Sequence, residues 1–326
     1  MRRFLASLQP WRQGYDWLGI LYVVLSGFLP LLNPACFAAL SERGPLHALG
    51  PHLALHAVVA AAIYVVPPVL RRSTAPGARL LGVIYLPLLF PWLYGELAFL
   101  GVVFRDFGQS FDPLLIDLEQ RVFGLQPSLA WSRAWPWRWL LEVMEFAYFT
   151  YYFFAIIGLV LIWRTGGRGR DRNWALSAAL IRDLGAVMLS CYAWYAVFPV
   201  WGPKYFEYLG VAGSVESEGL RGWLFSDVMR WIHANGALCG AAFPSSHVAG
   251  SMVSWWWGWK VAPRHRWWFT TLWAMLTLSI VYCRYHYVVD LVGGVAWAAF
   301  VMWLTARYMA APADGLRRDT GSPAGR

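Results

Sequence analysis

The sequence has 326 residues, of which 59% are hydrophobic and only 14% are charged. Soluble domains carry about a quarter of charged residues, so the composition excludes an ordinary soluble fold and a disordered chain. The apolar stretches are continuous rather than alternating, which excludes an outer-membrane barrel and predicts membrane-spanning helices. The net charge of +9 fits basic cytoplasmic loops, and without a nucleic-acid motif we expect no nucleic-acid partner.

Eight apolar stretches are each long enough to cross the hydrocarbon core of a bilayer, which takes about 20 residues. We therefore predict an all-α, polytopic integral membrane bundle that forms one domain over residues 1–326. In chain order, the predicted spans are 17–34, 53–70, 80–104, 139–163, 175–199, 246–262, 267–283 and 286–306.

The distribution of basic residues predicts the orientation. Arg and Lys gather in alternate segments between the spans, and the set that includes both termini is the more basic. The N-terminus, MRRFLASLQPWRQGYD, is basic, and no small-residue cleavage site follows it, as in an uncleaved signal anchor. We predict a multi-pass protein of the plasma (inner) membrane with both termini in the cytoplasm, and with segments 105–138, 200–245 and 284–286 outside.

The segment after the third span predicts an amphipathic helix. We expect Asp112 as its N-cap, Pro113 at its first position and Gly124 at its C-terminal stop. Two interpretations stay open, a helix in the outer membrane interface or a loop helix packed on the protein. The expected apolar stripe comprises Leu114, Leu115, Leu118 and Val122.

Ionisable residues also occur inside the spans, where each is a functional hypothesis by default. For these we favour structural roles, with Arg182 and Asp183 pairing with each other or with a neighbour. The other three ionisable residues inside the predicted spans are Glu96, Glu142 and Glu145.

The first cluster that suggests chemistry is FPSSH, residues 243–247, at the outer end of the sixth span. We expect Pro244 in the first helical turn, where unpaired backbone N–H groups bind anions. The hydroxyls of Ser245 and Ser246 add donors, and His247 follows them. We interpret the cluster as a phosphate cradle beside an acid–base imidazole; an ordinary helix start with an interfacial histidine is the alternative.

The second cluster is CRYHYVVD, residues 283–290. His286 and Asp290 are four residues apart, so we expect them on one helix face. A carboxylate bonded to one imidazole nitrogen makes the other more basic, as a phosphoryl-accepting nucleophile requires. Arg284 is close enough in sequence to neutralise a phosphate; a pair that serves only packing is the alternative. Neither cluster supplies three metal ligands with usual spacing, so we predict no metal and no cofactor.

Together, PSSH and HYVVD resemble the paired motifs of the type-2 phosphatidic acid phosphatase superfamily. FPSSHVAGS and YHYVVDLVGG, and more loosely DPLLIDLEQRVFGLQPS, resemble its inositol phosphorylceramide synthase-like branch of lipid phosphatases and phosphotransferases. The resemblance implies a six-helix, phosphatase-like catalytic core within residues 75–306. Residues 1–74 then form N-terminal spans and residues 307–326 a flexible cytoplasmic tail.

The resemblance also implies roles for single residues. His286 is the nucleophile that forms a phosphohistidine, Asp290 orients it, and His247 is the general acid for the leaving alkoxide. Ser245 and Ser246, with nearby amides, hold phosphate oxygens, and no metal is implied.

Two parts of the superfamily pattern are missing. Its first motif, a Lys followed by Arg-Pro, is absent, and Lys204 is our candidate for that charge, with Arg221 a weaker one. Its third motif has Ser-Arg where this chain has Ser279-Ile280, and Arg284 is our candidate replacement.

These observations predict a metal-independent lipid phosphate phosphatase whose partners are a lipid phosphate or phospholipid substrate and the bilayer itself. A lipid phosphotransferase that uses an alcohol acceptor is the first alternative. A transporter in which His286 and Asp290 relay protons is the second.

Overall fold

The computed structural model describes residues 1–33, 49–98, 110–165, 169–211 and 221–309. Within these ranges the chain forms 13 α-helices, a few 3₁₀ turns and no strand, which confirms the all-α prediction. The predicted tail over 307–326 lies largely outside the described residues, since the last helix ends at Tyr308.

Five of the described helices are long and apolar enough to cross a membrane. They are α2 (Gly14–Phe28, extended by a 3₁₀ turn to Leu32), α4 (Leu49–Arg72), α5 (Pro76–Gly95), α11 (Arg170–Val197) and α15 (Val288–Tyr308).

The predicted span over 139–163 consists of two helices rather than one. These are α9 (Arg138–Phe149) and α10 (Tyr151–Thr165), which meet at an angle of 52° and together could form a sixth span. The helices at the next two predicted spans are α13 (Ser246–Val261) and α14 (Arg266–Tyr282), which have 16 and 17 residues. Both helices are shorter than the about 20 residues that cross the hydrocarbon core of a bilayer. A total of eight crossings therefore remains a prediction.

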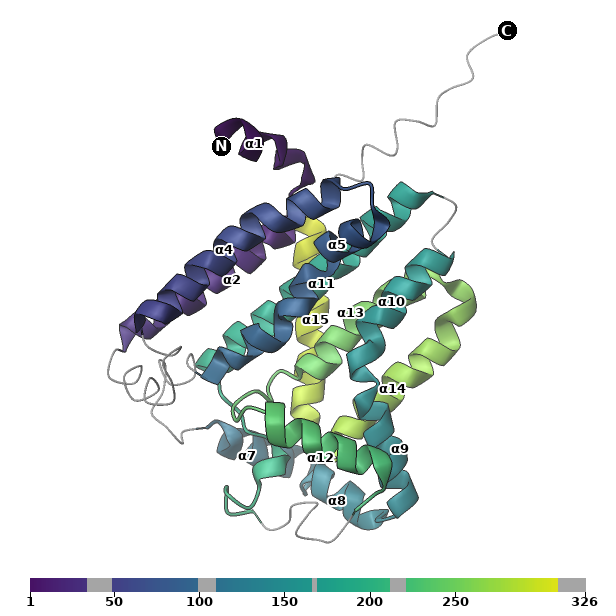
Figure 1. The fold of residues 1–326 in the computed structure, drawn as a ribbon. Helices are drawn as coiled ribbons and strands as arrows, with labels where there is room; N and C mark the ends of the chain where they lie inside the picture. The colour runs from purple at the N-terminus through teal and green to yellow at the C-terminus, as the bar shows by residue number, and fades with distance from the viewer. Residues whose placement is uncertain (34–48, 99–109, 166–168, 212–220, 310–326) are drawn as a thin grey trace.

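Helix α11 is the centre of the bundle. It packs against α2, α5, α10, α13 and α15 (Figure 1). Of its most apolar stretch, 72% is buried. Helix α4 covers α2 and α5 on the outside of the bundle. Proline sets two of the helix ends, because it cannot continue a helix: Pro199 follows α11 and Pro263 separates α13 from α14.

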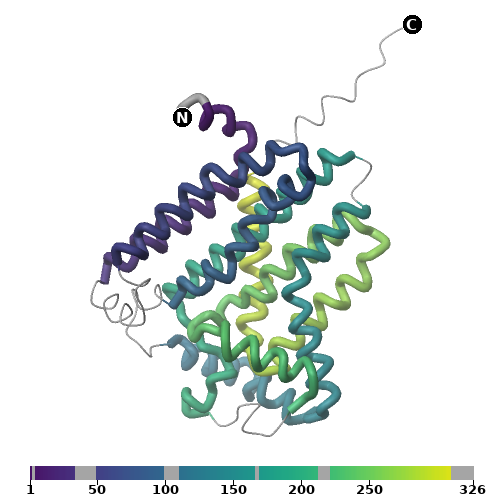
Figure 2. Tube along the Cα trace, in the orientation of Figure 1, coloured from purple at the N-terminus to yellow at the C-terminus, as the bar shows by residue number. Residues whose placement is uncertain are grey.

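The two ends of the bundle differ. The short helix α1 (Arg2–Ser7) and the carboxyl end of α15 lie at one end, whereas the other end is covered by short helices (Figures 1 and 2). These are α7 (Asp112–Phe123), α8 (Pro127–Ala134) and α12 (Leu224–Gly236). The described parts of the segments predicted to be outside thus gather at one end, and which side of the membrane that end faces remains a prediction.

Helix α7 forms where the amphipathic helix was expected, but Asp112 is not its N-cap. Phe111 takes the N-cap position, and Asp112 is the first helical residue, fully buried. Its carboxylate accepts hydrogen bonds from the backbone N–H groups of Trp201 and Gly202, at 2.6 and 2.8 Å, so tertiary contacts replace the local cap. Gly124 ends the helix at φ 71°, as predicted.

The expected apolar stripe on α7 is divided between two faces. Leu115 is buried in the protein, whereas Leu114, Leu118 and Val122 are exposed. One face therefore packs on the bundle and a second apolar row faces outward, so a position in the membrane interface remains a prediction.

Candidate active site

Helix α13 begins at Ser246, where the sixth span was predicted to start, so Pro244 is not in its first turn. Pro244 precedes the helix, and Ser245 is the N-cap, whose hydroxyl accepts a hydrogen bond from the N–H of Val248 at 3.4 Å. The N–H of Ser246 donates to the hydroxyl of Tyr195 on α11 at 3.0 Å. Two amides of the proposed cradle therefore already have partners within the protein.

His286 lies in the tight turn between α14 and α15, not on a helix face. Helix α15 begins only at Val288, because the backbone N–H groups of Tyr285 and His286 both donate to the carbonyl of Ile280. The turn needs a left-handed residue, and Arg284 adopts φ 60° there, which is uncommon for a long side chain. His286 and Asp290 therefore meet across the start of α15, which corrects the expectation of a shared helical face.

The imidazole of His286 is held on one side by acceptors alone. Its Nδ1 lies 3.0 Å from the carbonyl oxygen of Ala242 and 3.2 Å from Oδ2 of Asp290. Because neither partner can donate, Nδ1 carries the proton, and Nε2 keeps its lone pair in the neutral ring. Asp290 is fully buried, and its Oδ2 also accepts from the N–H of Tyr287 at 2.9 Å.

His247 stands opposite His286. The centroids of the two rings are 5.5 Å apart, and the hydroxyl of Tyr148 on α9 lies 2.9 Å from Nε2 of His247. No local sequence pattern indicates Tyr148, because it lies 99 positions away from its partner His247. The rings of His247 and His286 therefore lie edge to face. Each ring is held by a different part of the chain, His247 by Tyr148 and His286 by Ala242 and Asp290.

Two glycines allow the segments that carry His247 and His286 to come close to their neighbours. A Cβ on Gly294 of α15 would lie 2.7 Å from the carbonyl oxygen of Ser245, so the starts of α13 and α15 meet only with glycine there. Gly202 adopts φ 92°, and a Cβ on it would lie 2.8 Å from the carbonyl oxygen of Tyr285. Both positions are therefore needed to bring the two histidine segments together.

A cavity of about 610 Å³ opens onto the two histidines. Ser246 and Lys204 also line it, so they share the polar end with His247 and His286. Much of the remaining wall is apolar or aromatic, and the part from α5, α10 and α11 comprises Pro87, Phe90, Pro91, Tyr94, Tyr151, Tyr152, Leu184, Met188 and Tyr192. A pocket with a polar end and a largely apolar wall suits an amphiphile.

Three predicted site residues do not line this cavity. Ser245 is buried as the helix cap, and Asp290 lies behind His286. Arg284 is only 1% exposed, and its Nε donates to the hydroxyl of Ser132 on α8 at 2.7 Å. Arg284 thus anchors the turn that carries His286, which differs from the phosphate contact expected for it.

Several residues that support the site were missed by the sequence reasoning. Glu119 of α7 is fully buried, and it accepts hydrogen bonds from the N–H groups of Val288 and Val289 at the start of α15, at 2.6 and 3.4 Å. Burial raises the pKa of Glu119 to about 7, although these two hydrogen bonds oppose the shift. The hydroxyl of Tyr287 donates to Asp112 at 2.8 Å, so two carboxylates of α7 hold the turn that carries His286.

His233 of α12 also lines the cavity and was not singled out from the sequence. Burial, with a smaller effect of the positive charge on Lys204, lowers the pKa of His233 to about 3. The ring therefore stays neutral at physiological pH, and it packs edge-on against Tyr285 with centroids 4.3 Å apart. The hydroxyl of Tyr285 donates to both oxygens of Glu145, each at 2.9 Å, which gives this acid of the predicted fourth span a structural partner.

Other intramembrane charges also have structural partners, as favoured from the sequence. Arg182 and Asp183 form a buried ion pair at 2.7 Å. Glu142 accepts hydrogen bonds from the N–H groups of Trp223 and Phe225, at 2.7 and 2.6 Å, and so caps the start of α12.

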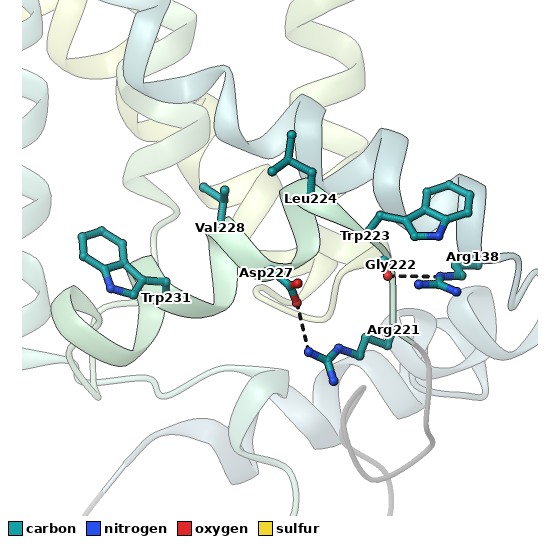
Figure 3. A pocket seen from close by; sticks show the side chains of 8 residues that line it. All are labelled: Arg138, Arg221, Gly222, Trp223, Leu224, Asp227, Val228 and Trp231. Carbon is teal, nitrogen blue, oxygen red and sulfur yellow. Dashed lines mark hydrogen bonds and ion pairs between the residues drawn. The ribbon is translucent and has the colours of Figure 1, made fainter.

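A second cavity, of about 710 Å³, lies beside α12 at the surface (Figure 3). There Arg221 pairs with Asp227 at 3.3 Å, and Nε of Arg138 donates to the carbonyl of Gly222. The described residues of its wall include no histidine or hydroxyl nucleophile, so the smaller cavity is the better candidate for chemistry. Arg221, the weaker candidate for the missing first-motif charge, lies here and not beside His286.

Residues 114–304 match the family model of the PAP2 superfamily, the type-2 phosphatidic acid phosphatases. No curated protein and no solved structure matches the chain. The matched stretch is more than half of the sequence, and it runs from the first turn of α7 through both histidines into the last turns of α15. On this match the chain belongs to the PAP2 superfamily.

Proposed function

We propose that this protein is a membrane-embedded lipid phosphate phosphatase that works through a phosphohistidine on His286. The observation that carries the proposal is the arrangement of the two imidazoles at the polar end of the cavity, with Nδ1 of His286 fixed by acceptors. Membership of the PAP2 superfamily supports phosphatase-type chemistry on a lipid phosphate.

The first step is attack by Nε2 of His286 on phosphorus, which breaks the bond to the ester oxygen of the lipid. His247 gives a proton to the departing alkoxide, so a neutral lipid alcohol leaves. Asp290 stabilises the positive charge that forms on the ring of His286, since its carboxylate lies 3.2 Å from Nδ1. The phosphoryl group remains on Nε2 as a phosphoramidate.

The second step releases the phosphate. A water molecule attacks phosphorus, His247 accepts its proton, and the P–N bond breaks to return the lone pair to Nε2. Lys204 and the hydroxyl of Ser246 are the polar groups of the cavity wall that meet the phosphoryl oxygens. No metal takes part in this scheme.

The lipid tails would follow the apolar part of the cavity between α5, α10 and α11. Aromatic and aliphatic side chains form that wall, and transfer of acyl chains from the bilayer into it costs little free energy. We further propose that the site faces the outer side of the plasma membrane, because the segments around it carry fewer basic residues than those at the other end.

Phosphotransfer to an alcohol is the second candidate, and the cavity itself favours it. A space of about 610 Å³ with a largely apolar wall leaves room beyond a phosphate group and limits the access of water. An alcohol bound there would replace water in the second step with no change in the histidine chemistry. The resemblance of FPSSHVAGS and YHYVVDLVGG to the inositol phosphorylceramide synthase-like branch points in the same direction.

The decisive experiment combines product analysis with trapping of the intermediate. Purified protein is incubated with ³²P-labelled lipid phosphates, and acid-labile, base-stable label on the protein is measured together with released inorganic phosphate. His286→Ala is expected to lose both signals. The matched control is His265→Ala, which removes a histidine that contacts only Trp268 among the ring contacts described and lies in the turn between α13 and α14, at the ends of these helices away from both motifs.

Retention of turnover or of labelled protein in His286→Ala would overturn the mechanism. The division of the phosphoryl group between water and an alcohol then separates the two candidate functions. Inositol, glycerol or a sugar alcohol is added at increasing concentration, and the amount of inorganic phosphate is compared with the amount of phosphorylated alcohol. Dominant alcohol product at millimolar acceptor, with free phosphate near background, would replace the phosphatase assignment by a phosphotransferase.

A further inference from the structure

A second cluster of ionisable side chains lies outside the matched residues 114–304 and outside the cavity. It joins His52 and His56, one turn apart on α4, to Glu96 at the end of α5. All three are buried, with exposed fractions of 3, 3 and 6%. The sequence signal for it is the spacing of His52 and His56, four residues apart, which places both rings on one face of a helix.

The hydrogen bonds of His56 determine which of its nitrogens faces the carboxylate. Its Nδ1 lies 2.9 Å from the carbonyl oxygen of His52, an acceptor, so Nδ1 carries the proton. Nε2 therefore points its lone pair at Oε2 of Glu96, which is 3.3 Å away. Two lone pairs that face each other in a buried site repel, unless a positive charge lies between them.

The described part of the chain offers no lysine or arginine for that charge. Among the described residues, the ion-pair partners of Glu96 are His52 and His56 alone, with no Lys or Arg. Neither Nε2 of His56 nor Oε2 of Glu96 has a hydrogen-bond partner in the described part of the chain. A carboxylate buried among membrane helices without a cation is costly, so something must compensate it.

We propose that His52, His56 and Glu96 bind one divalent transition-metal ion of the zinc class. Tetrahedral ligands at zinc bond lengths lie about 3.4 Å from one another. The observed separations from Oε2 of Glu96 are 3.3 Å to Nε2 of His56 and 3.9 Å to Nδ1 of His52, and all three ligand atoms lie within 4.8 Å. Small side-chain rotations bring such a set to bonding distance.

The chemistry of the donors selects the metal. Two imidazoles and one carboxylate suit zinc and its neighbours better than magnesium or calcium, which prefer oxygen ligands. The carbonyl of His52 supports His56 in the way that metal-bound histidines are commonly oriented. Three protein ligands leave a fourth position open for water.

The position of the cluster indicates its effect on the fold. Arg71, at the other end of α4, is fixed to Asp16 of α2 by two hydrogen bonds of 2.6 Å. A metal at His52 and His56 would fix the opposite end of α4 to α5, and α5 supplies Tyr94 to the cavity wall two residues before Glu96. None of the three ligands lines the cavity, so the ion is separate from the phosphoryl chemistry.

The test measures metal directly and does not depend on turnover. The full-length protein is expressed in zinc-supplemented medium, purified without an affinity tag on the final product, and analysed for metal by mass spectrometry. We expect about one zinc per chain in the wild type and at least about a tenfold lower content in His56→Gln and Glu96→Gln. His265→Gln, which removes a histidine outside the cluster, is expected to keep the wild-type content.

Cobalt substitution tests the site in the wild-type protein, where folding of a variant is not in question. Co²⁺ is expected to give the intense visible absorption of a four-coordinate site, and stoichiometric Zn²⁺ should remove it. Substoichiometric zinc in the wild type, equal zinc in all variants, or only the weak spectrum of six-coordinate cobalt would each overturn the proposal. The cluster would then share a proton in place of a metal.

Discussion

Replacement of Asp290 by Asn tests how the carboxylate acts on His286. Both hydrogen bonds that Asp290 accepts, from Nδ1 of His286 and from the N–H of Tyr287, end on Oδ2, whereas Oδ1 is buried without a hydrogen-bond partner in the described structure. An Asn side chain can therefore place its single oxygen where Oδ2 lies. The substitution preserves the geometry and removes the charge.

The size of the effect follows from these contacts. Hydrogen bonds to a charged group contribute about 1.5–3 kcal/mol and neutral ones about 0.5–1.5 kcal/mol, so the loss is about 1–2 kcal/mol in the step that charges the ring. This corresponds to a decrease of about 5- to 30-fold in kcat. The proton on Nδ1 stays in place, because the carbonyl of Ala242 still accepts it at 3.0 Å.

Phosphate release from a short-chain lipid phosphate in detergent provides the assay, with kcat and KM determined separately. We expect Asp290→Asn to lower kcat and leave KM nearly unchanged, and His286→Ala to show no turnover. Asp227→Asn is the control, since that carboxylate pairs with Arg221 and Arg230 on the surface. An unchanged kcat, or a loss as complete as that of His286→Ala, would refute the reasoning.

Three further predictions concern the proposed general acid His247, the pH dependence of stability and the orientation of the protein in the membrane. Tyr148→Phe removes the hydroxyl at Nε2 of His247, so kcat should fall about tenfold for alkyl phosphates but little for an aryl phosphate, whose leaving group needs no proton; equal losses would contradict the role of His247. Because burial raises the pKa of Glu119 to about 7, its contribution to stability is full at low pH and is lost as pH rises through about 7. Thermal unfolding in detergent at pH 5 and pH 8 should therefore differ less in Glu119→Gln than in the wild type, and an identical pH dependence would speak against this burial effect. A reporter that is active only in the cytoplasm, fused after residue 225, should stay silent, and strong activity would reverse the orientation.

Much of the candidate site could be predicted because its residues are close in sequence. PSSH and HYVVD each carry their chemistry within a few positions, and the structure brings His247 and His286 to one cavity. The roles assigned to them remain to be tested. Arg284 shows the limit of such local reasoning, since its charge is near His286 in sequence yet its side chain turns toward Ser132 of α8.

The sequence by itself determined the helical, membrane-type character of the chain, the positions of most helices and the two histidine motifs. Hydrophobic runs and helix-ending residues act over one or a few turns, so they can be read without knowing the partners of a helix. Only the tertiary structure decided that α9 and α10 bend apart, that Asp112 and Glu119 support the turn of His286, and that His56 meets Glu96. Glu119 lies 169 positions from Val288, and Asp112 lies 175 positions from Tyr287. Contacts between residues so far apart in sequence depend on how all the helices pack together. Helix packing, and not local sequence preference, determines which buried polar groups form hydrogen bonds with each other.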